Sequence, residues 1–438
     1  MLAYYLRLGL LSLRRNPALT ALMVMAIGFG VAASMITWSV FRVVSGNPIP
    51  WKSNQLYTVQ VDNRGPQYNE PGNEPPEALN YTDAMALLKA HKALHQTLFY
   101  DIGPSVLPVD PNDLPTTAYG YATNADFFSM FDVPFEYGSP WTDADDDAHA
   151  AVAVISGDLN KKLFGGANSV GREVTLNMHT YRIVGVTRHW DPKPRYYDLF
   201  DGMQFQDAPQ VYVEFNRAID LRIGQSGRNN CGGEPMHIHS EEEWLHRECA
   251  WIPFWVQLPT PADAERYKEF LTAYAADQQH AGRFQWAPNV RLRNVTQWLD
   301  FEKVVPDESR ISLFVSMGFF VICLVNTIGL LLAKFMRRAA EIGVRRALGA
   351  NRREVYTQFL LEAVAVGLAG GVLGLLLTIV GMQGVGLLFE PDIARLAHVD
   401  VSLLVTTLLV AVLATVIAAF YPTWRAAQVQ PAWQLKSN

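Results

Sequence analysis

Four long apolar runs dominate the hydrophobic pattern of the chain. They are Ala18–Val40, Ile311–Ala333, roughly Val355–Phe389, and Val401–Phe420. Each is long enough for the about 20 residues that a helix needs to cross a bilayer. The third run exceeds one crossing, which predicts a tilt, a kink near 381–386, or an end outside the lipid. The pattern therefore predicts an α-helical membrane protein with four transmembrane helices.

A cleaved signal peptide is an alternative interpretation of the first run. Its apolar stretch is about 23 residues long, whereas a signal core usually has about 7–15. The three later runs require a membrane protein under either interpretation.

The segment 46–308 shows the shorter periods of a mixed α/β domain. Strands are predicted at Gln55–Asp62 and Phe254–Leu258, and helices at Tyr81–Leu98 and Ala262–Ala276. Helix signals separated by strand-rich stretches predict two subdomains. The membrane-proximal one comprises about 50–110 and 250–305, the inserted one comprises 111–249, and the segments 62–80 and 188–235 are predicted to be loops.

The fold class predicted is thus four transmembrane helices with a large mixed α/β periplasmic domain inserted between helices 1 and 2. The remaining parts are assigned by their position and composition. They are an amphipathic helix at 1–16, transmembrane helices at 17–45, 309–335, 354–389 and 400–421, a basic coupling segment at 336–353, a periplasmic loop at 390–399 and a tail at 422–438.

Charge is distributed unevenly along the chain, and this predicts its orientation. The segments 1–17, 334–353 and 422–438 hold twelve of the 36 basic residues and one of the 42 acidic residues. Short basic segments beside transmembrane helices remain in the cytoplasm. Both termini are therefore predicted to be cytoplasmic, with the acidic segment 46–308 in the periplasm of a multi-pass inner-membrane protein. The net charge of −6 argues against a nucleic-acid partner.

The stretch Glu341–Leu375 begins with a basic segment that contains glycines, residues 341–353, which we call the elbow. A helix rich in small residues follows it. The elbow suits docking to a soluble partner, but a basic loop without a partner has the same composition. Small residues four apart allow close approach of helix backbones. Such spacing at Gly367, Gly370, Gly371 and Gly374 predicts packing against a second permease, with packing inside one chain as the alternative.

Polar residues within the apolar runs are predicted to be structural. Glu362 lies close enough to the basic loop to pair with an arginine or to lie at the interface, and Asn326 is expected to bond between helices. Cys323 is a packing residue. Cys231 and Cys249 lie in the exported segment, where disulfides persist. A disulfide between them is the main interpretation. A metal site that adds His237, His239 and His246 is the alternative. Because the spacing matches no standard zinc site, we predict no metal ligands.

Several motifs in consistent order resemble one family. EIGVRRALGANRREVYTQFLLEA with the following GLAGGVLGLLL, and the ending AAFYPTWRAAQVQPAWQL, resemble the MacB/FtsX/LolC-type permeases of ABC transporters. The exported FFSMFDVPFEYGSP, AVAVISGDLNKKLFGGANSVGREVTLN and YRIVGV resemble the MacB-type periplasmic core domain. The resemblance covers all four apolar runs and most of the exported part.

The resemblance implies a dimer of permeases bound to two ATPase subunits. ATP-driven closure of the ATPases would rock the helices and move the periplasmic domain, a process called mechanotransmission. By position, the ATPase-coupling residues would be Glu341, Ile342, Gly343, Arg345, Arg346, Leu348 and Gly349.

Two departures from MacB proper qualify this implication. The sequence contains no GxxxxGK[ST] phosphate loop. ATP and Mg are therefore expected in a partner ABC ATPase, and this chain is expected to bind no cofactor directly and to have no catalytic residue. The stretch 188–250 exceeds what the core domain needs. It carries an aromatic run of Arg195, Tyr196, Tyr197, Phe200 and Phe205.

The leading functional prediction is a permease subunit for efflux of a peptide, antibiotic or lipophilic substrate, or for lipoprotein handling. Its expected partners are ABC ATPase subunits, a second identical or paralogous permease, membrane lipid, and a periplasmic adaptor with an outer-membrane channel. The alternative is an FtsX-like regulatory or sensing protein that controls a cell-wall hydrolase or a signalling partner.

Overall fold

The computed structural model divides the chain into two compact units. The first unit comprises 1–45 and 305–438, and the second comprises 46–304. The residues described are 16–64, 70, 72–110, 112, 114–199, 204–227, 229–231, 240–338, 341–342, 344, 351–384 and 400–427. The predicted amphipathic helix before Asn16, the loop 390–399 and the tail beyond Ala427 lie outside these ranges.

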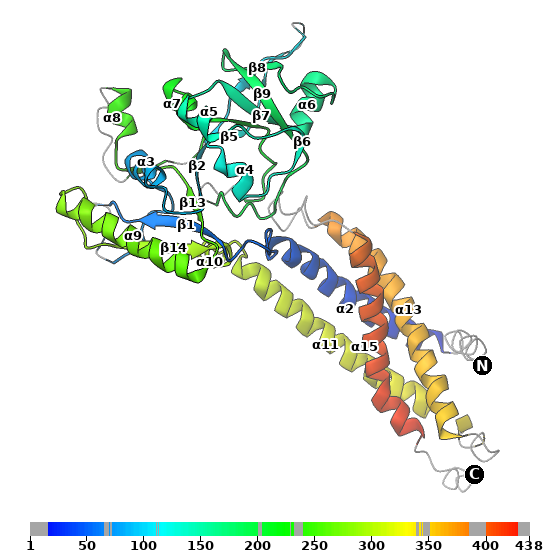
Figure 1. The fold of residues 1–438 in the computed structure, drawn as a ribbon. Coiled ribbons are helices and arrows are strands. Elements are labelled where there is room, and N and C mark those ends of the chain that lie inside the picture. Colours follow the sequence, from blue (N-terminus) through cyan, green and yellow to red (C-terminus); the bar gives the residue numbers. More distant parts are fainter. Residues whose placement is uncertain are drawn as a thin grey trace. The chain divides into compact units, whose positions relative to one another are not determined.

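Four long helices form the first unit and run side by side (Figure 1). They are α2 (Pro17–Val44), α11 (Asp307–Met336), α13 (Arg352–Gly384) and α15 (Val401–Ala427). All four are long and apolar enough to cross a membrane. Their shared core includes Ile27, Leu331, Phe359 and Ala411, while large apolar side chains such as Phe314 and Leu409 point outward. Outward apolar side chains are what a lipid surround requires.

α13 is one continuous helix as far as Gly384. Residues 385–399 lie outside the described ranges, so the tilt, kink or end outside the lipid predicted for this run stays a prediction. One detail of another helix differs from the sequence prediction. α15 continues past the predicted end at 421 to Ala427, with Pro422 inside the helix. A helix can retain an internal proline at the expense of one backbone hydrogen bond.

A mixed sheet of twelve strands organises the second unit. Its path is β14-β1-β13-β2-β5-β10-β7-β9-β8-β3-β4, and β6 pairs with β9. The pairs β5/β10 and β7/β9 are parallel, and the other pairs are antiparallel. The strands are β1 (Leu56–Val61), β2 (His95–Ile102), β3 (Ser105–Val106), β4 (Thr116–Thr117), β5 (Gly120–Thr123), β6 (Phe135–Gly138), β7 (Val152–Ser156), β8 (Glu173–Leu176), β9 (His179–Thr187), β10 (Val211–Glu214), β13 (Phe254–Gln257) and β14 (Val290–Asn294).

The helices of the second unit are labelled in Figure 1. They are α3 (Tyr81–Ala90), α4 (Asp126–Met130), α5 (Asp143–Asp147), α6 (Gly157–Phe164), α7 (Phe215–Asp220), α8 (Glu241–Leu245), α9 (Pro261–His280) and α10 (Val295–Phe301). A separate pair of short strands, β11 (Asn230–Cys231) and β12 (Cys249–Ala250), lies outside the main sheet. The fold class predicted from sequence, four helices with a sheet-rich domain between the first and second, is confirmed.

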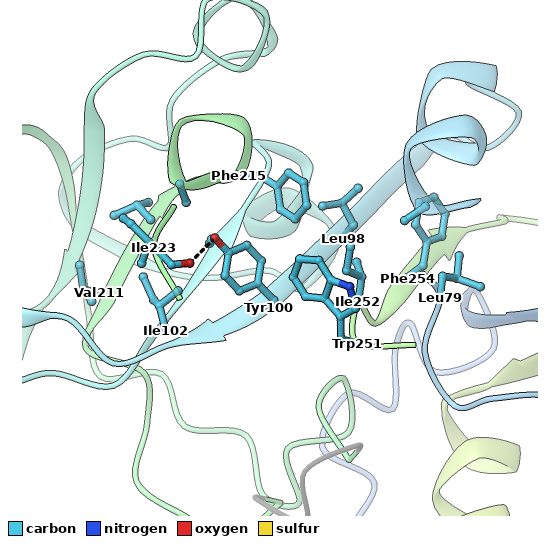
Figure 2. Close-up of a cluster of buried hydrophobic side chains, with 14 of the residues drawn as sticks. Leu79, Leu98, Tyr100, Ile102, Val211, Phe215, Ile223, Trp251, Ile252 and Phe254 are labelled. Atoms are coloured by element: carbon cyan, nitrogen blue, oxygen red, sulfur yellow. Dashed lines mark hydrogen bonds between the residues drawn. The ribbon is translucent and has the colours of Figure 1, made fainter. Parts of the chain in front are cut away.

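The strand β2 lies inside the sheet and connects its two parts. It pairs with β13 on one side and with β5 on the other. β14, β1 and β13 lie beyond one edge of β2 and come from 56–61 and 254–294, whereas the strands beyond the other edge come from 105–214. Leu98, Tyr100 and Ile102 of β2 are buried, and Figure 2 shows them in the core with Phe215 and Trp251.

Two sequence predictions about this unit are wrong. The helix predicted over Tyr81–Leu98 ends at Ala90, because His91 adopts a left-handed conformation that closes it, and β2 begins at His95. The segment 188–235, predicted to be a loop, contains β10 and α7. In both places, burial of apolar side chains against the sheet outweighs the local sequence signal.

Candidate functional site

A buried cluster of ion pairs joins α11 to α13 at the base of the elbow. Glu362 on α13 is 1% exposed, and Lys334 on α11 is completely buried. The Lys334 Nζ lies 2.5 Å from Glu362 Oε1. Arg338, one helical turn after Lys334, donates from Nη1 to Glu362 Oε2 at 3.1 Å. The carboxylate of Glu362 is therefore held by one cation on α11 and by a second just after the end of that helix.

A fourth charged group links this cluster to the elbow itself. Arg338 Nε lies 3.8 Å from the carboxylate of Glu341. Removal of one partner from a buried ion pair leaves an uncompensated charge, which costs about 3–5 kcal/mol. The cluster therefore fixes the end of α11, the start of the elbow and α13 in one geometry. We name Lys334, Arg338, Glu341 and Glu362 the elbow cluster.

The elbow is also anchored by apolar packing. Ile342 is 5% exposed and lies in the bundle core with Phe335, Val355 and Phe359. The rings of Phe335 and Phe359 have centroids 4.2 Å apart. The Ile342 side chain therefore attaches the elbow to the bundle, and its predicted contact with an ATPase stays a prediction.

The other predicted coupling residues have different outcomes. Glu341 keeps 39% of its side chain exposed and so remains accessible beside the buried Ile342. Gly343, Arg345, Arg346, Leu348 and Gly349 lie outside the described residues. For Glu362, sequence reasoning offered an arginine partner or an interface position. The structure shows pairing within the chain and adds Lys334, whose spacing of four residues from Arg338 was a signal that the sequence analysis missed.

The four glycines of α13 pack against other helices of the same chain, while the predicted contact with a second permease stays a prediction. A Cβ added at Gly370 would meet Ile27 of α2 at 2.8 Å, and one at Gly374 would meet Val31 at 3.3 Å. Added Cβ atoms at Gly367 and Gly371 would meet α15, at Thr415 and Ala411, both at 3.1 Å. All four positions are buried. α13 presents small residues on two sides because it lies between α2 and α15.

The structure joins Cys231 and Cys249 in a disulfide between β11 and β12, with their Cα atoms 4.2 Å apart. This is the main interpretation of the two cysteines from sequence. Cys323 is a free, buried cysteine. Within the described ranges, no three His, Cys, Asp or Glu side chains are placed to hold a metal ion. His237 and His239 lie outside those ranges.

The aromatic run that distinguishes 188–250 is part of the domain core. Tyr196 and Tyr197 are each 1% exposed, and Tyr197 stacks on Phe131 with ring centroids 5.0 Å apart. Arg195 is fully buried and donates to the hydroxyl of Tyr119 at 3.0 Å and to the carbonyl of Gln206 at 3.0 Å. This part of the stretch therefore stabilises the sheet and is not a peripheral addition. Phe200 lies outside the described residues.

The fold and the elbow define a class: an integral-membrane protein with one helix, a large sheet domain, and three further helices anchored at a charged turn. The model for the MacB-like periplasmic core domain matches residues 20–274. The model for the FtsX-like permease C-terminal region matches residues 313–431. The chain therefore belongs to the MacB/FtsX-type permeases of ABC transporters, which are membrane proteins with a periplasmic core domain.

The curated relatives that the chain matches include proteins named export ATP-binding/permease proteins. The pyoverdine export ATP-binding/permease protein PvdT of Pseudomonas aeruginosa is 26% identical over 343 residues, covering 76% of this chain and 45% of that protein. The macrolide export ATP-binding/permease protein MacB of Salmonella typhi is 24% identical over 385 residues, covering 85% and 52%. The chain thus spans about half the length of the curated relatives it matches.

Solved structures resemble the sheet domain more distantly. The periplasmic region of MacB from Actinobacillus actinomycetemcomitans has 14% identity and a TM-score of 0.37, covering 58% of this chain and 94% of that chain. The extracellular domain of the noncanonic ABC-type transporter YknZ from Gram-positive bacteria has 13% identity and a TM-score of 0.34, covering 55% and 100%. The family assignment rests on the two family models.

Proposed function

We propose that this chain is an export permease subunit that couples ATP hydrolysis by a separate ABC ATPase to movement of its periplasmic domain. The relatives named as export proteins support the export role. ATP and Mg would be bound by the ATPase and not by this chain. The substrate is a peptide, antibiotic or lipophilic molecule, or a lipoprotein, taken from the periplasmic side.

The observation that carries this proposal is the anchoring of the elbow. The elbow cluster and the buried Ile342 attach the elbow to α11 and α13 through a buried carboxylate and an apolar core. An exposed basic loop without a partner would not need such an attachment. A rigid attachment allows a push on the elbow to tilt the helices, because packed cores transmit strain.

Both termini and the elbow are proposed to face the cytoplasm, with 46–304 in the periplasm. The charge distribution supports this orientation, since basic residues concentrate at the elbow. A periplasmic adaptor and an outer-membrane channel would complete the export route. The FtsX-like regulatory alternative shares the coupling step and differs in the periplasmic partner, so an export assay in reconstituted vesicles separates the two functions.

A second permease is proposed to pack on α11, because the glycines of α13 are occupied. Gly318 and Gly329 lie on the outward side of α11 with no atom within 4 Å of an added Cβ, and Asn326 is exposed nearby. Small and polar residues are favoured where transmembrane helices meet. In a Cys323→Ser background, Ile322→Cys should form a disulfide-linked dimer, whereas the buried Leu331→Cys should not. Cross-linking at Val372→Cys on α13 alone would place the interface elsewhere.

The coupling proposal is tested by reversing charge at the elbow. Arg345→Glu with Arg346→Glu should abolish co-purification with the ATPase, or its ATP turnover in the complex, without preventing membrane insertion. The matched control, Arg345→Lys with Arg346→Lys, keeps the charge and should retain assembly. Normal assembly and normal ATP turnover in the charge-reversed variant would show that these arginines are not the coupling contact.

A further inference from the structure

A cavity of about 640 Å³ lies in the second unit beside the segments joined by the Cys231–Cys249 disulfide. Most of its lining comes from the stretch 188–250, whose role the family resemblance leaves open. Three parts of the chain line it. The first is β2 together with Trp251, which follows β12; the second is the end of α7 with the loop after it; the third is α8. The lining residues used below are Tyr100, Arg222, Ile223, Glu242, Trp244 and Trp251.

The inner wall of the cavity is aromatic and rigid. Tyr100 is 1% exposed and Trp251 is 2% exposed, with ring centroids 5.1 Å apart. The Tyr100 hydroxyl donates to the carbonyl of Ile223 at 3.2 Å, as Figure 2 shows. Trp244 of α8 extends the wall, with its ring centroid 5.2 Å from that of Trp251. The polar atom of Tyr100 is thus satisfied, and Trp244 is the partly exposed ring of this wall.

The rim of the cavity is polar and carries one positive and one negative side chain. The side chains of Arg222 and Glu242 are exposed at its edge. Pockets that bind small molecules combine a mostly apolar lining with a few polar groups and have volumes of about 300–1,000 Å³. This cavity has both properties.

Two local features hold the outer wall in place. Ser240 caps α8 by accepting a hydrogen bond from the Glu243 backbone N–H at 3.1 Å. The disulfide joins β11, which follows the loop after α7, to β12, which precedes Trp251. The disulfide therefore ties the segment after α7 to the segment that leads into Trp251.

We propose that this cavity binds a small amphipathic molecule. An aromatic or fused-ring body would lie against the partly exposed ring of Trp244, beside the buried Trp251, because flat apolar rings gain both burial and ring–ring contact there. Its polar groups would face Arg222 and Glu242. The site deepens the proposed function, since the ligand would be the export substrate. Binding itself needs no ATPase, so failure of binding and failure of coupling are distinguishable.

The experiment measures protection of a single cysteine in the full-length protein. Gly224 lines the cavity, and an added Cβ there meets nothing within 4 Å. Gly224→Cys in a Cys323→Ser background is labelled with a hydrophilic maleimide in lipid nanodiscs. Labelling is repeated with the anionic dye anilinonaphthalene sulfonate and with the cationic dye rhodamine 6G. Thr272→Cys, on the exposed side of α9, is the control for dye that merely partitions into lipid.

At least one dye should slow labelling of Gly224→Cys in a saturable manner and leave Thr272→Cys unchanged. Adding Trp244→Ala should raise the half-protecting concentration about tenfold, as loss of an aromatic anchor does. Trp286→Ala, at a half-buried tryptophan outside the cavity, should not raise it. Arg222→Gln should weaken the anionic dye only, and Glu242→Gln the cationic dye only.

Three results would overturn the proposal. The first is no protection by either dye up to its solubility limit. The second is equal protection at Gly224→Cys and Thr272→Cys, which would mean adsorption to lipid. The third is a Gly224→Cys thiol that does not react even without dye, since the cavity would then be filled by the protein itself.

Discussion

At the scale of single residues, Glu362 is the group on which the elbow depends most. Its carboxylate is 1% exposed and is paired with Lys334 and Arg338. Charged side chains inside a membrane protein are expensive unless they are paired. The sequence placed an acid near a basic loop, but only the fold shows that its partners are Lys334 on α11 and Arg338 just after the end of α11.

Substitution of Glu362 by Gln should destabilise the helical unit by about 3–5 kcal/mol, because two cations lose their counter-charge. The midpoint of thermal unfolding in detergent measures the effect. Glu354→Gln, at an exposed position on the same helix, is the control and should change the midpoint little. Replacing Lys334 and Glu362 together by Met should recover part of the loss. A midpoint for Glu362→Gln equal to that of Glu354→Gln would refute the role of the elbow cluster.

A second residue gives the sheet domain a pH dependence. Burial raises the pKa of Asp146 to about 7, although hydrogen bonds from the Ala125 N–H and the Trp141 ring N–H oppose this shift. The folded state therefore binds the Asp146 proton more tightly than the unfolded state, whose pKa is near 3.8. The stabilisation is complete below about pH 4 and is lost as the pH rises to about 7.

The wild-type protein should accordingly lose stability relative to Asp146→Asn as the pH increases between 4 and 7. Thermal unfolding of the two proteins at several pH values provides the difference, and this difference removes the contribution of other carboxylates. If the wild-type protein gained stability relative to the variant over this range, the direction of the Asp146 shift would be wrong.

At the scale of elements, α13 shows what sequence patterns can and cannot decide. The spacing of Gly367, Gly370, Gly371 and Gly374 correctly indicates close helix contacts, but it does not identify the partner helix. α2 and α15 occupy those contacts within the chain. The outward face of α11 carries Gly318 and Gly329, which are too far apart in the sequence to form the four-residue spacing.

A matched pair of glycine variants tests this assignment. Gly370→Ala should destabilise the helical unit by about 1–3 kcal/mol, because the new Cβ meets Ile27 at 2.8 Å. Gly318→Ala adds a methyl group to open space on α11 and should be neutral or slightly stabilising for the isolated chain. Thermal unfolding of the monomeric fraction compares the two. Equal tolerance of both substitutions would contradict the packing of α13 on α2.

Elements of the sheet domain were harder to predict than the membrane helices. A run of about 20 apolar residues has few structural interpretations other than a membrane helix. A strand such as β2 is buried on both faces, so its sequence does not alternate between apolar and polar residues. The aromatic run near Arg195 has the composition of a binding surface but lies in the core, because Phe131 and Trp255 pack against it. Which residues cover an aromatic side chain depends on strand order, which the sequence does not reveal.

At the scale of the whole molecule, the partition of charge and the order of motifs made the family recognisable from the sequence. The elbow was located in the same way, but its attachment to the bundle required coordinates. The two units carry separate tasks in the proposed function. The helical unit receives the movement of the ATPase at the elbow, and the sheet unit offers a cavity for a ligand.

The central claim is that ATP-driven movement at the elbow reaches the sheet domain through the elbow cluster. The most direct measurement is the distance between two spin labels, determined by double electron–electron resonance. The labels are attached at Thr272→Cys on two permease copies bound to the ATPase. The account predicts a distance distribution that shifts between the nucleotide-free and ATP-bound complexes, and a reduced shift in Glu362→Gln. An identical distribution in both nucleotide states of an ATP-hydrolysing wild-type complex would contradict it.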